Sequence, residues 1–433
     1  MRRIVFAVLI LIYVLLPWIP IRGAPAVFFN AAERKVHLFG HTLVFQDLWL
    51  GFFIITGLGF SLYYVTALFG RIWCGWACPQ TVFLEGVYRR IERWIEGDGP
   101  KRERLAAAPN TTGKIVKRVI KHGFFILVSL FIAHVFISYF VSLPRLWGMM
   151  RSSPFENWTA FLWVFTMSGI FYFNFAWFRE QLCIVICPYG RLQSALIDDH
   201  SLVIGYDEKR GEPRGKLNTP GAGDCVACFR CVQVCPTGID IRQGLQMECI
   251  GCSACIDACD EVMDKVNKPR GLIRYDSQNG FEGRKTKYLR PRTMVYTAML
   301  LAGVVAFSLA LSSLKPFTGT VQRMQGAPFY QQDGMVRNQF LMRLTNKRAE
   351  PTRLIIDIDG TGLPLTWNRG EGVFELAARE ERMVPLMVSL PADQFPGRFP
   401  LTIQIENAAN GHQLTITVPF LGPDSLVQPP PIP

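Results

Sequence analysis

Two cysteine runs with the same internal spacing constrain this chain more than any other feature. In each run, three cysteines are separated by two residues and a fourth follows three residues later. Three thiolates spaced this way on a tight loop reach three corners of one iron–sulfur cube, whereas the fourth lies on the following helical turn and points toward another cube. The spacing is that of bacterial two-cluster ferredoxins and predicts a fold around two [4Fe–4S] clusters.

The expected ligand sets are therefore crossed between the runs. The first cluster takes Cys225, Cys228, Cys231 and Cys259, and the second takes Cys249, Cys252, Cys255 and Cys235. Structural zinc is the main alternative, but zinc sites usually pair two CxxC units across a longer gap. Disulfides are disfavoured because the charge pattern assigns this segment to the reducing side of a membrane.

Five apolar stretches are long enough to cross a bilayer, which takes about 20 residues. They run roughly over residues 4–21, 48–69, 123–143, 158–178 and 294–314. Only 18% of all residues are charged, against about 25% in a soluble domain. Because 50% are hydrophobic and 12% aromatic, the composition excludes a disordered chain, which needs low hydrophobicity and high charge. We interpret the first stretch as an uncleaved anchor rather than a secretory signal, because it has no clean small-residue cleavage pattern.

Lysine and arginine in the loops predict the orientation of these spans. Segment 71–121 holds eleven of them, whereas segments 22–47 and 144–157 hold three and two. We therefore expect the N-terminus, segment 71–121 and segment 179–293 in the cytoplasm, and the C-terminus outside. The formal charge of +12 is then mostly an orientation signal, and no nucleic-acid motif accompanies it.

The other four cysteines form two CxxxCP repeats, Cys74 with Cys78 and Cys183 with Cys187, which follow the second and fourth apolar stretches. A spacing of four places both sulfurs of a repeat on one face of a helix. The two repeats would then meet at the cytoplasmic membrane face. Four soft ligands there suit Cu(I), zinc or another iron–sulfur centre, and a thiol pair also passes electrons as a disulfide. Buried structural cysteines are the remaining alternative.

Residues 315–433 contain no cysteine and alternate between apolar and polar residues in short runs. The runs cover residues 339–345, 353–359, 372–376, 383–390, 398–405 and 413–418. Short alternating runs separated by turn residues predict strands of a β-sandwich. The proline-rich tail, residues 427–433, is expected to be unstructured.

Several weaker candidates are open to two interpretations. His134 lies within the third apolar stretch, where it either ligates a metal or haem or hydrogen-bonds across helices; His122 lies at its boundary. His37, His41 and the pair Met149-Met150 fall in the outer loops, where they bind copper or are simply solvated. No glycine-rich nucleotide fingerprint appears, so the chain does not oxidise NADH itself.

The chain resembles the cytochrome c oxidase accessory protein family, the CcoG, FixG and RdxA group associated with cbb3-type oxidases. The motifs that carry the resemblance lie at residues 235–260, 262–265, 269–275, 73–83, 17–19 and 46–47, and the match covers nearly the whole chain. It implies an immunoglobulin-like C-terminal domain and a role in reducing Cu(II) to Cu(I) for delivery to the oxidase. The eight ferredoxin-type cysteines then carry over as cluster ligands, and Cys74, Cys78, Cys183 and Cys187 become candidates for copper contact or relay.

The expected architecture is a polytopic α-helical membrane protein of the bacterial cytoplasmic membrane. It comprises a membrane domain (1–178), a cytoplasmic ferredoxin-type domain (179–293), a fifth span (294–314) and a periplasmic immunoglobulin-like β-sandwich (315–433). The expected partners are copper-handling proteins, the oxidase assembly machinery and a cytoplasmic electron donor that the sequence does not identify.

Three functions fit these features. The first is a cupric reductase that feeds oxidase assembly. The second is a non-enzymatic assembly scaffold or redox sensor, and the third is a quinol-linked polyferredoxin electron carrier.

Overall fold

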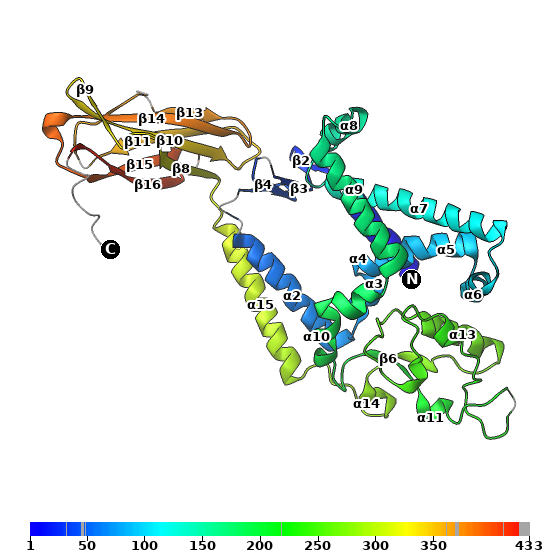
Figure 1. Ribbon diagram of the computed structural model, residues 1–433. Coiled ribbons are helices and arrows are strands. Elements are labelled where there is room, and N and C mark those ends of the chain that lie inside the picture. The colour runs from blue at the N-terminus through cyan, green and yellow to red at the C-terminus, as the bar shows by residue number, and fades with distance from the viewer. Residues whose placement is uncertain are drawn as a thin grey trace. The chain divides into compact units, whose positions relative to one another are not determined.

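The computed structural model describes residues 1–31, 33–44, 47, 49–217, 219–360, 362–368, 372–409 and 411–423. The proline-rich tail at 427–433 lies outside these residues. The chain divides into two compact units: unit 1 comprises Met1–Ile19 and Trp49–Leu309, and unit 2 comprises Pro20–Leu48 and Ala310–Pro433. Each unit is described separately (Figure 1).

Unit 1 carries the membrane helices. Among the described residues, four helices are long and apolar enough to cross a membrane: α2 (Trp49–Phe69), α7 (Thr112–Ile137), α9 with the π-turn η3 (Trp158–Phe178), and α15 (Pro291–Ser312). They correspond to four of the five predicted spans. Their side chains are largely unburied within the chain, as expected for surfaces that face lipid.

The first predicted span is a shorter helix than expected. Helix α1 covers Arg2–Leu15, which is 14 residues, or about 21 Å at 1.5 Å per residue. Pro17 and Pro20 lack the N–H groups that would continue it, and the chain leaves the helix through a turn in which Trp18 and Ile19 donate to Leu15 O.

The remaining membrane-side elements are short. They are α3 (Ile72–Trp76), α4 (Pro79–Phe83), η2 (Leu84–Tyr88), α5 (Arg89–Glu96), α6 (Gly99–Ala107), α8 (Leu143–Arg151), η4 (Leu182–Ile186) and α10 (Pro188–Leu196). A buried cluster of Leu84, Tyr88, Phe125, Ile132 and Phe175 joins α7 to η2 and η3. Tyr88 Oη also bonds to Ser129 Oγ at 2.7 Å, which fixes η2 against α7.

The cysteine-rich part of unit 1 is small and loop-rich. Its elements are β6 (Val203–Tyr206), α11 (Glu208–Gly211), α12 (Arg230–Gln233), η5 (Ile241–Gln243), α13 (Ala254–Lys265), β7 (Ile273–Asp276) and α14 (Gln278–Phe281). Strands β6 and β7 pair antiparallel. Cysteines from both runs pack into its core together with Ile204, Ile241, Met263 and Ile273.

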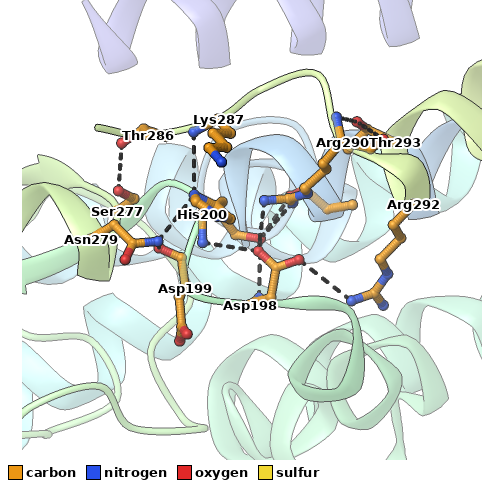
Figure 2. A network of polar contacts seen from close by, with 12 residues as sticks. Asp198, Asp199, His200, Ser277, Asn279, Thr286, Lys287, Arg290, Arg292 and Thr293 are labelled. Carbon is orange, nitrogen blue, oxygen red and sulfur yellow. Dashed lines mark hydrogen bonds and ion pairs between the residues drawn. The ribbon is translucent and has the colours of Figure 1, made fainter. Parts of the chain in front are cut away.

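A buried polar network fixes this part to the ends of α2 and α15. Arg290, which precedes α15, pairs with Asp198 at 2.7 Å and donates to Ala67 O in α2 at 2.5 Å. Ser201 Oγ donates to the same carbonyl at 2.7 Å. Figure 2 shows Arg290 and Arg292 converging on Asp198, with Asn279 beside His200. The cysteine-rich part is thereby attached directly to two membrane helices.

Unit 2 is a β-sandwich. One sheet has the order β12-β14-β10-β8 with β9 also paired to β10, and the other has the order β13-β11-β15-β16. The strands are β8 (Phe317–Arg323), β9 (Tyr330–Gln332), β10 (Met335–Asn346), β11 (Thr352–Asp359), β12 (Thr366–Trp367), β13 (Val373–Leu376), β14 (Glu381–Pro391), β15 (Phe399–Asn407) and β16 (Gln413–Phe420). All six predicted alternating runs form strands, and their inward residues make one buried core.

Residues 22–47, expected as an outer loop, lie in a segment, residues 20–48, that contributes strands to unit 2. They form β1 (Pro20–Ile21), β2 (Ala24–Pro25), β3 (Val27–Asn30), β4 (Lys35–Leu38) and β5 (His41–Val44), with the last three in one sheet. Asp47 joins this segment to the sandwich through a buried ion pair with Lys347 Nζ at 2.7 Å.

Replacing Lys347 with Met should destabilise unit 2 by about 3 kcal/mol, because it leaves the Asp47 carboxylate buried without its cation. Limited proteolysis of the full chain should then cut unit 2 faster. The matched control is Arg343→Met, since the Arg343–Glu381 pair is more exposed and such pairs contribute little. Equal protease resistance of the two variants would contradict the prediction.

Candidate metal centre

The first cavity in the cysteine-rich part is lined by cysteines from both runs. Its cysteines are Cys225, Cys228, Cys231 and Cys259. Cys225 and Cys228 come from the loop that leads into α12, Cys231 lies on α12, and Cys259 comes from α13. Apolar groups of Met263, Leu272 and Ile273 form much of the remaining wall. The structure thus brings together the four thiols that the spacing assigned to one set.

The second cavity lies next to the first and is lined by the other set. Its cysteines are Cys235, Cys249, Cys252 and Cys255, together with Cys231, which lines both cavities. Its other walls are largely isoleucine side chains. Cys235, from the first run, therefore lines the second cavity with three cysteines of the second run, and Cys259, from the second run, lines the first cavity with three cysteines of the first run.

The two cysteine loops share a backbone conformation that the sequence did not reveal. In the first loop Ala227 and Phe229 have φ of 52° and 57°, and in the second Gly251 and Ser253 have φ of 66° and 61°. The offsets from the first cysteine are the same in both loops. Residues of this left-handed type curl a loop so that successive N–H groups line a concave anion site, as in many Fe–S proteins. Both loops therefore suit a negatively charged cluster.

The cysteines of these cavities are thiols in a poorly solvated environment. Burial raises the pKa of Cys249 to about 11 and that of Cys259 to about 12. Thiolates here therefore need a compensating positive charge, which iron supplies. Within the described residues, no three His, Cys, Asp or Glu side chains are arranged to hold a single metal ion. Thiols that surround a cavity instead fit a multi-atom cluster.

The CxxxCP cysteines also gather at one place. Cys74 lies on α3 and Cys78 precedes α4, whereas Cys183 lies on η4 and Cys187 precedes α10. Burial, and to a smaller extent the nearby Cys78, Cys74 and Cys187, raise the pKa of the Cys183 thiol to about 12. These four residues are referred to below as the CxxxCP quartet.

The prediction that each repeat places its sulfurs on one continuous helix face was wrong. Cys78 and Cys187 both adopt extended backbone, with ψ of 127° and 110°, and each is the N-cap of a new helix that begins with proline. A residue before proline avoids the α conformation, and proline favours the first helical position. Each motif is therefore a helix, a break and a second helix.

Gln193 is a site residue that the sequence did not single out. It is fully buried on α10, and its Nε2 donates to Cys74 Sγ at 3.3 Å. Nearby, Tyr189 Oη bonds to Thr66 Oγ1 of α2 at 2.5 Å. These contacts cross more than 100 residues of sequence, so no local pattern indicates them.

The quartet and the second cavity meet through their backbones. A Cβ on Gly75, between Cys74 and Cys78, would lie 2.5 Å from Gly251 O and 2.8 Å from Ile250 O. Only glycine permits this approach. Tyr275 Oη also donates to Gly251 O at 2.6 Å, which holds the loop in place. A further cavity is lined by Cys183 together with Met247 and Ile250.

Comparison with known proteins places these features in a family. Residues 178–278 match a 4Fe-4S dicluster domain, residues 48–97 match a 4Fe-4S binding domain, and residues 307–423 match the IG-like fold at the C-terminus of FixG. Protein RdxA of Cereibacter sphaeroides is 35% identical over 92% of this chain and 88% of its own length. Nitrogen fixation protein FixG of Rhizobium meliloti is 33% identical over 91% of this chain and 84% of its own length.

This chain belongs to the FixG/RdxA family. Protein RdxB of Cereibacter sphaeroides, 36% identical over 78% of this chain and 75% of its own, is a further relative. Like its family, the chain is an iron–sulfur electron-transfer protein with membrane-spanning helices and an immunoglobulin-like C-terminal domain.

None of the weaker candidates of this FixG/RdxA family member lines either cysteine cavity in the described part of the chain. His134 Nδ1 bonds to Leu130 O of its own helix at 2.8 Å, and His122 Nδ1 bonds to Tyr172 Oη at 2.9 Å. His37 is buried in β4, where it stacks on Phe28 and bonds to Thr42 Oγ1 at 3.0 Å. His41 is an exposed residue of β5. Met149 and Met150 lie on α8, where Met149 lines a separate cavity.

Proposed function

We propose that this chain carries electrons from two [4Fe–4S] clusters through the CxxxCP quartet to Cu(II), and that the resulting Cu(I) is used to assemble a cbb3-type cytochrome c oxidase. In this proposal the ligands are Cys225, Cys228, Cys231 and Cys259 for the first cluster, and Cys249, Cys252, Cys255 and Cys235 for the second. The two cavities with their converging thiols support these assignments. The family resemblance supplies the oxidase and its copper-handling partners.

The chemistry is a one-electron transfer. When bound, each cluster stores one electron and releases it again. Each electron delivered reduces one Cu(II) to Cu(I), with no bond or proton transferred in that step. A cytoplasmic one-electron reductant then reduces the clusters again. The residues of this chain enclose the two cluster sites and exclude water from the second one with isoleucine side chains. The CxxxCP quartet offers soft thiol sulfur, which favours Cu(I).

The observation that carries the proposal is the backbone contact between Gly75 and Gly251. It places the helix of Cys74 directly against the loop that contains Cys249 and Cys252. Cys231 lines both cluster cavities, so the order first cavity, second cavity, quartet is continuous. A continuous row of redox-active sites of this kind favours an electron-transfer protein over a non-enzymatic assembly scaffold.

The proposed sidedness follows from the charged loops. The eleven basic residues of segment 71–121 would face the cytoplasm with the cluster domain, and unit 2 would face the periplasm. Helix α1 then provides a fifth crossing despite its length. Its Arg2 donates to Cys252 O in the cluster domain, whereas Tyr139, beyond the end of α7, donates from Oη to Tyr13 O.

The direct test uses the purified full-length protein with both clusters reduced under anaerobic conditions. Adding Cu(II) should reoxidise the clusters and release one Cu(I) per electron, measured with a Cu(I)-specific chelator. Clusters that stay reduced with Cu(II) would overturn the cupric-reductase proposal. Reoxidation by a quinone alone would favour the quinol-linked carrier, and reoxidation by neither would favour the scaffold.

Replacing Cys183 with Ser should slow the reoxidation by Cu(II) about tenfold while the iron content of the protein stays unchanged. The reason is that the quartet loses one soft ligand but neither cluster cavity loses a thiol. Stopped-flow absorbance of the clusters measures the rate. Ser168→Ala, a buried substitution in α9, is the control, and equal rates for the two variants would contradict a role for the quartet.

A further inference from the structure

Two arginines from outside the cluster domain reach the loop of the second cavity. Arg2, at the start of α1, donates from Nη1 to Cys252 O at 3.0 Å. Arg71, between α2 and α3, donates from Nη1 to Met247 O and, at 3.4 Å, to Cys249 O. Its Nη2 donates to Gly190 O at 2.6 Å. Arg71 therefore contacts the second cavity's loop and the segment after Cys187 at the same time.

Neither guanidinium is neutralised. In the part of the chain that the structure describes, no carboxylate forms an ion pair with Arg2 or Arg71, and the hydrogen-bond acceptors of both side chains there are backbone carbonyls. A carbonyl oxygen accepts a hydrogen bond but leaves the positive charge in place, and Nε and Nη2 of Arg2 are buried without a hydrogen-bond partner among the described residues. Glu85, the acid that acts on Cys252, is itself paired with Arg89 at 3.0 Å. Arg2 and Arg71 therefore lie at the second cavity's loop as cations without an ion-pair partner among the described residues, whereas Glu248, the acid next to Cys249, is exposed and screened by water.

The first cavity is surrounded differently. Its buried cation, Arg242, lies over the Phe229 ring at 4.1 Å and is bound by both carboxylate oxygens of Asp240, at 2.8 and 2.7 Å. This bidentate pair cancels its charge. Arg230 also lines this cavity, but it is exposed, so water screens it. Asp260, next to Cys259, adds negative charge.

We propose that Arg2 and Arg71 raise the reduction potential of the second cluster above that of the first, so that electrons move from the first cluster to the second and on toward the CxxxCP quartet. Reduction adds one negative charge to a cluster, and a nearby uncompensated cation stabilises the reduced form, more strongly where water is excluded. The inference rests on the two cavities holding clusters. It does not depend on Cu(II) being the final acceptor.

The test is a potentiometric EPR titration of the full-length, cluster-loaded protein. Arg71→Gln and Arg2→Gln are each expected to shift the electron equilibrium of the second cluster about tenfold toward the oxidised form, a fall of about 59 mV for one electron. The first cluster should shift much less. The signals are assigned with Cys259→Ser and Cys235→Ser, each of which retains one cluster. Arg71→Lys, which keeps the charge, should restore most of the potential.

The control is Arg118→Gln, which removes a charge from an exposed position of α7 and should leave both potentials unchanged. The proposal is overturned if the glutamine variants shift both clusters equally or neither. Loss of iron in Arg71→Gln together with an unshifted potential in Arg2→Gln would also overturn it, since the arginines would then be structural. Failure of Cu(II) to reoxidise the clusters leaves these potentials unaffected, so the two proposals fail separately.

Discussion

Replacing Cys259 with Ser is expected to remove the cluster of the first cavity, although Cys259 belongs to the second cysteine run. Replacing Cys235 with Ser should remove the other cluster instead. The reason is that each of these side chains lines the cavity of the opposite run. Iron should fall from about eight to about four atoms per chain in each variant. Iron analysis and EPR of the reduced protein measure both effects.

The two variants serve as controls for each other, because each should keep the signal that the other loses. If Cys259→Ser removes the signal that depends on Cys249 and Cys252, the ligand sets are not crossed. Zinc in place of iron and labile sulfide in anaerobically prepared protein would reject clusters altogether.

Replacing Gly75 with Ala should slow electron transfer from the clusters to Cu(II) on the order of a hundredfold. The added methyl group would lie 2.5 Å from Gly251 O, and neither backbone can yield without separating α3 from the cluster loop. Overpacking of this kind also costs about 1–3 kcal/mol. Reoxidation of pre-reduced clusters, followed by stopped-flow absorbance, measures the rate, and the iron content shows that both clusters remain.

Gly57→Ala provides the matched control. Gly57 is also a helical glycine of the membrane part, but a Cβ there meets no atom within 4 Å. Its rate should equal that of the unaltered protein. Should Gly75→Ala transfer electrons equally fast, the contact between α3 and the Gly251 loop would not be the route.

The features predicted correctly from sequence are those with local periodicity. Four spans follow from apolar length, and strands β10, β11 and β15 follow from alternation, because burial of one face repeats every second residue. The helix break within each CxxxCP motif also has a local cause. Pro79 and Pro188 force the preceding cysteine into an extended conformation, and this effect outweighs the four-residue spacing that predicted a single helix face.

The features that the sequence could not show depend on distant contacts. Arg71 meets Cys249 and Gln193 meets Cys74, each across more than 100 residues, and nothing near Arg71 or Gln193 marks it as more than a polar residue. The strands between residues 20 and 48 were missed for a similar reason. Their burial depends on partners such as Arg379, whose carbonyl accepts from Lys35 Nζ at 3.2 Å.

The discontinuous composition of unit 2 has a consequence for biosynthesis. Its first strands come from residues 20–48, but the sandwich that completes it comes from residues 310–433. Chains are synthesised from the N-terminus. Strands β1 to β5 therefore lack their packing partners from residues 310–433 until the ribosome has translated α15 and the sandwich strands. A chain terminated before residue 310 would therefore lack the Arg379 carbonyl that accepts from Lys35 Nζ in the finished molecule.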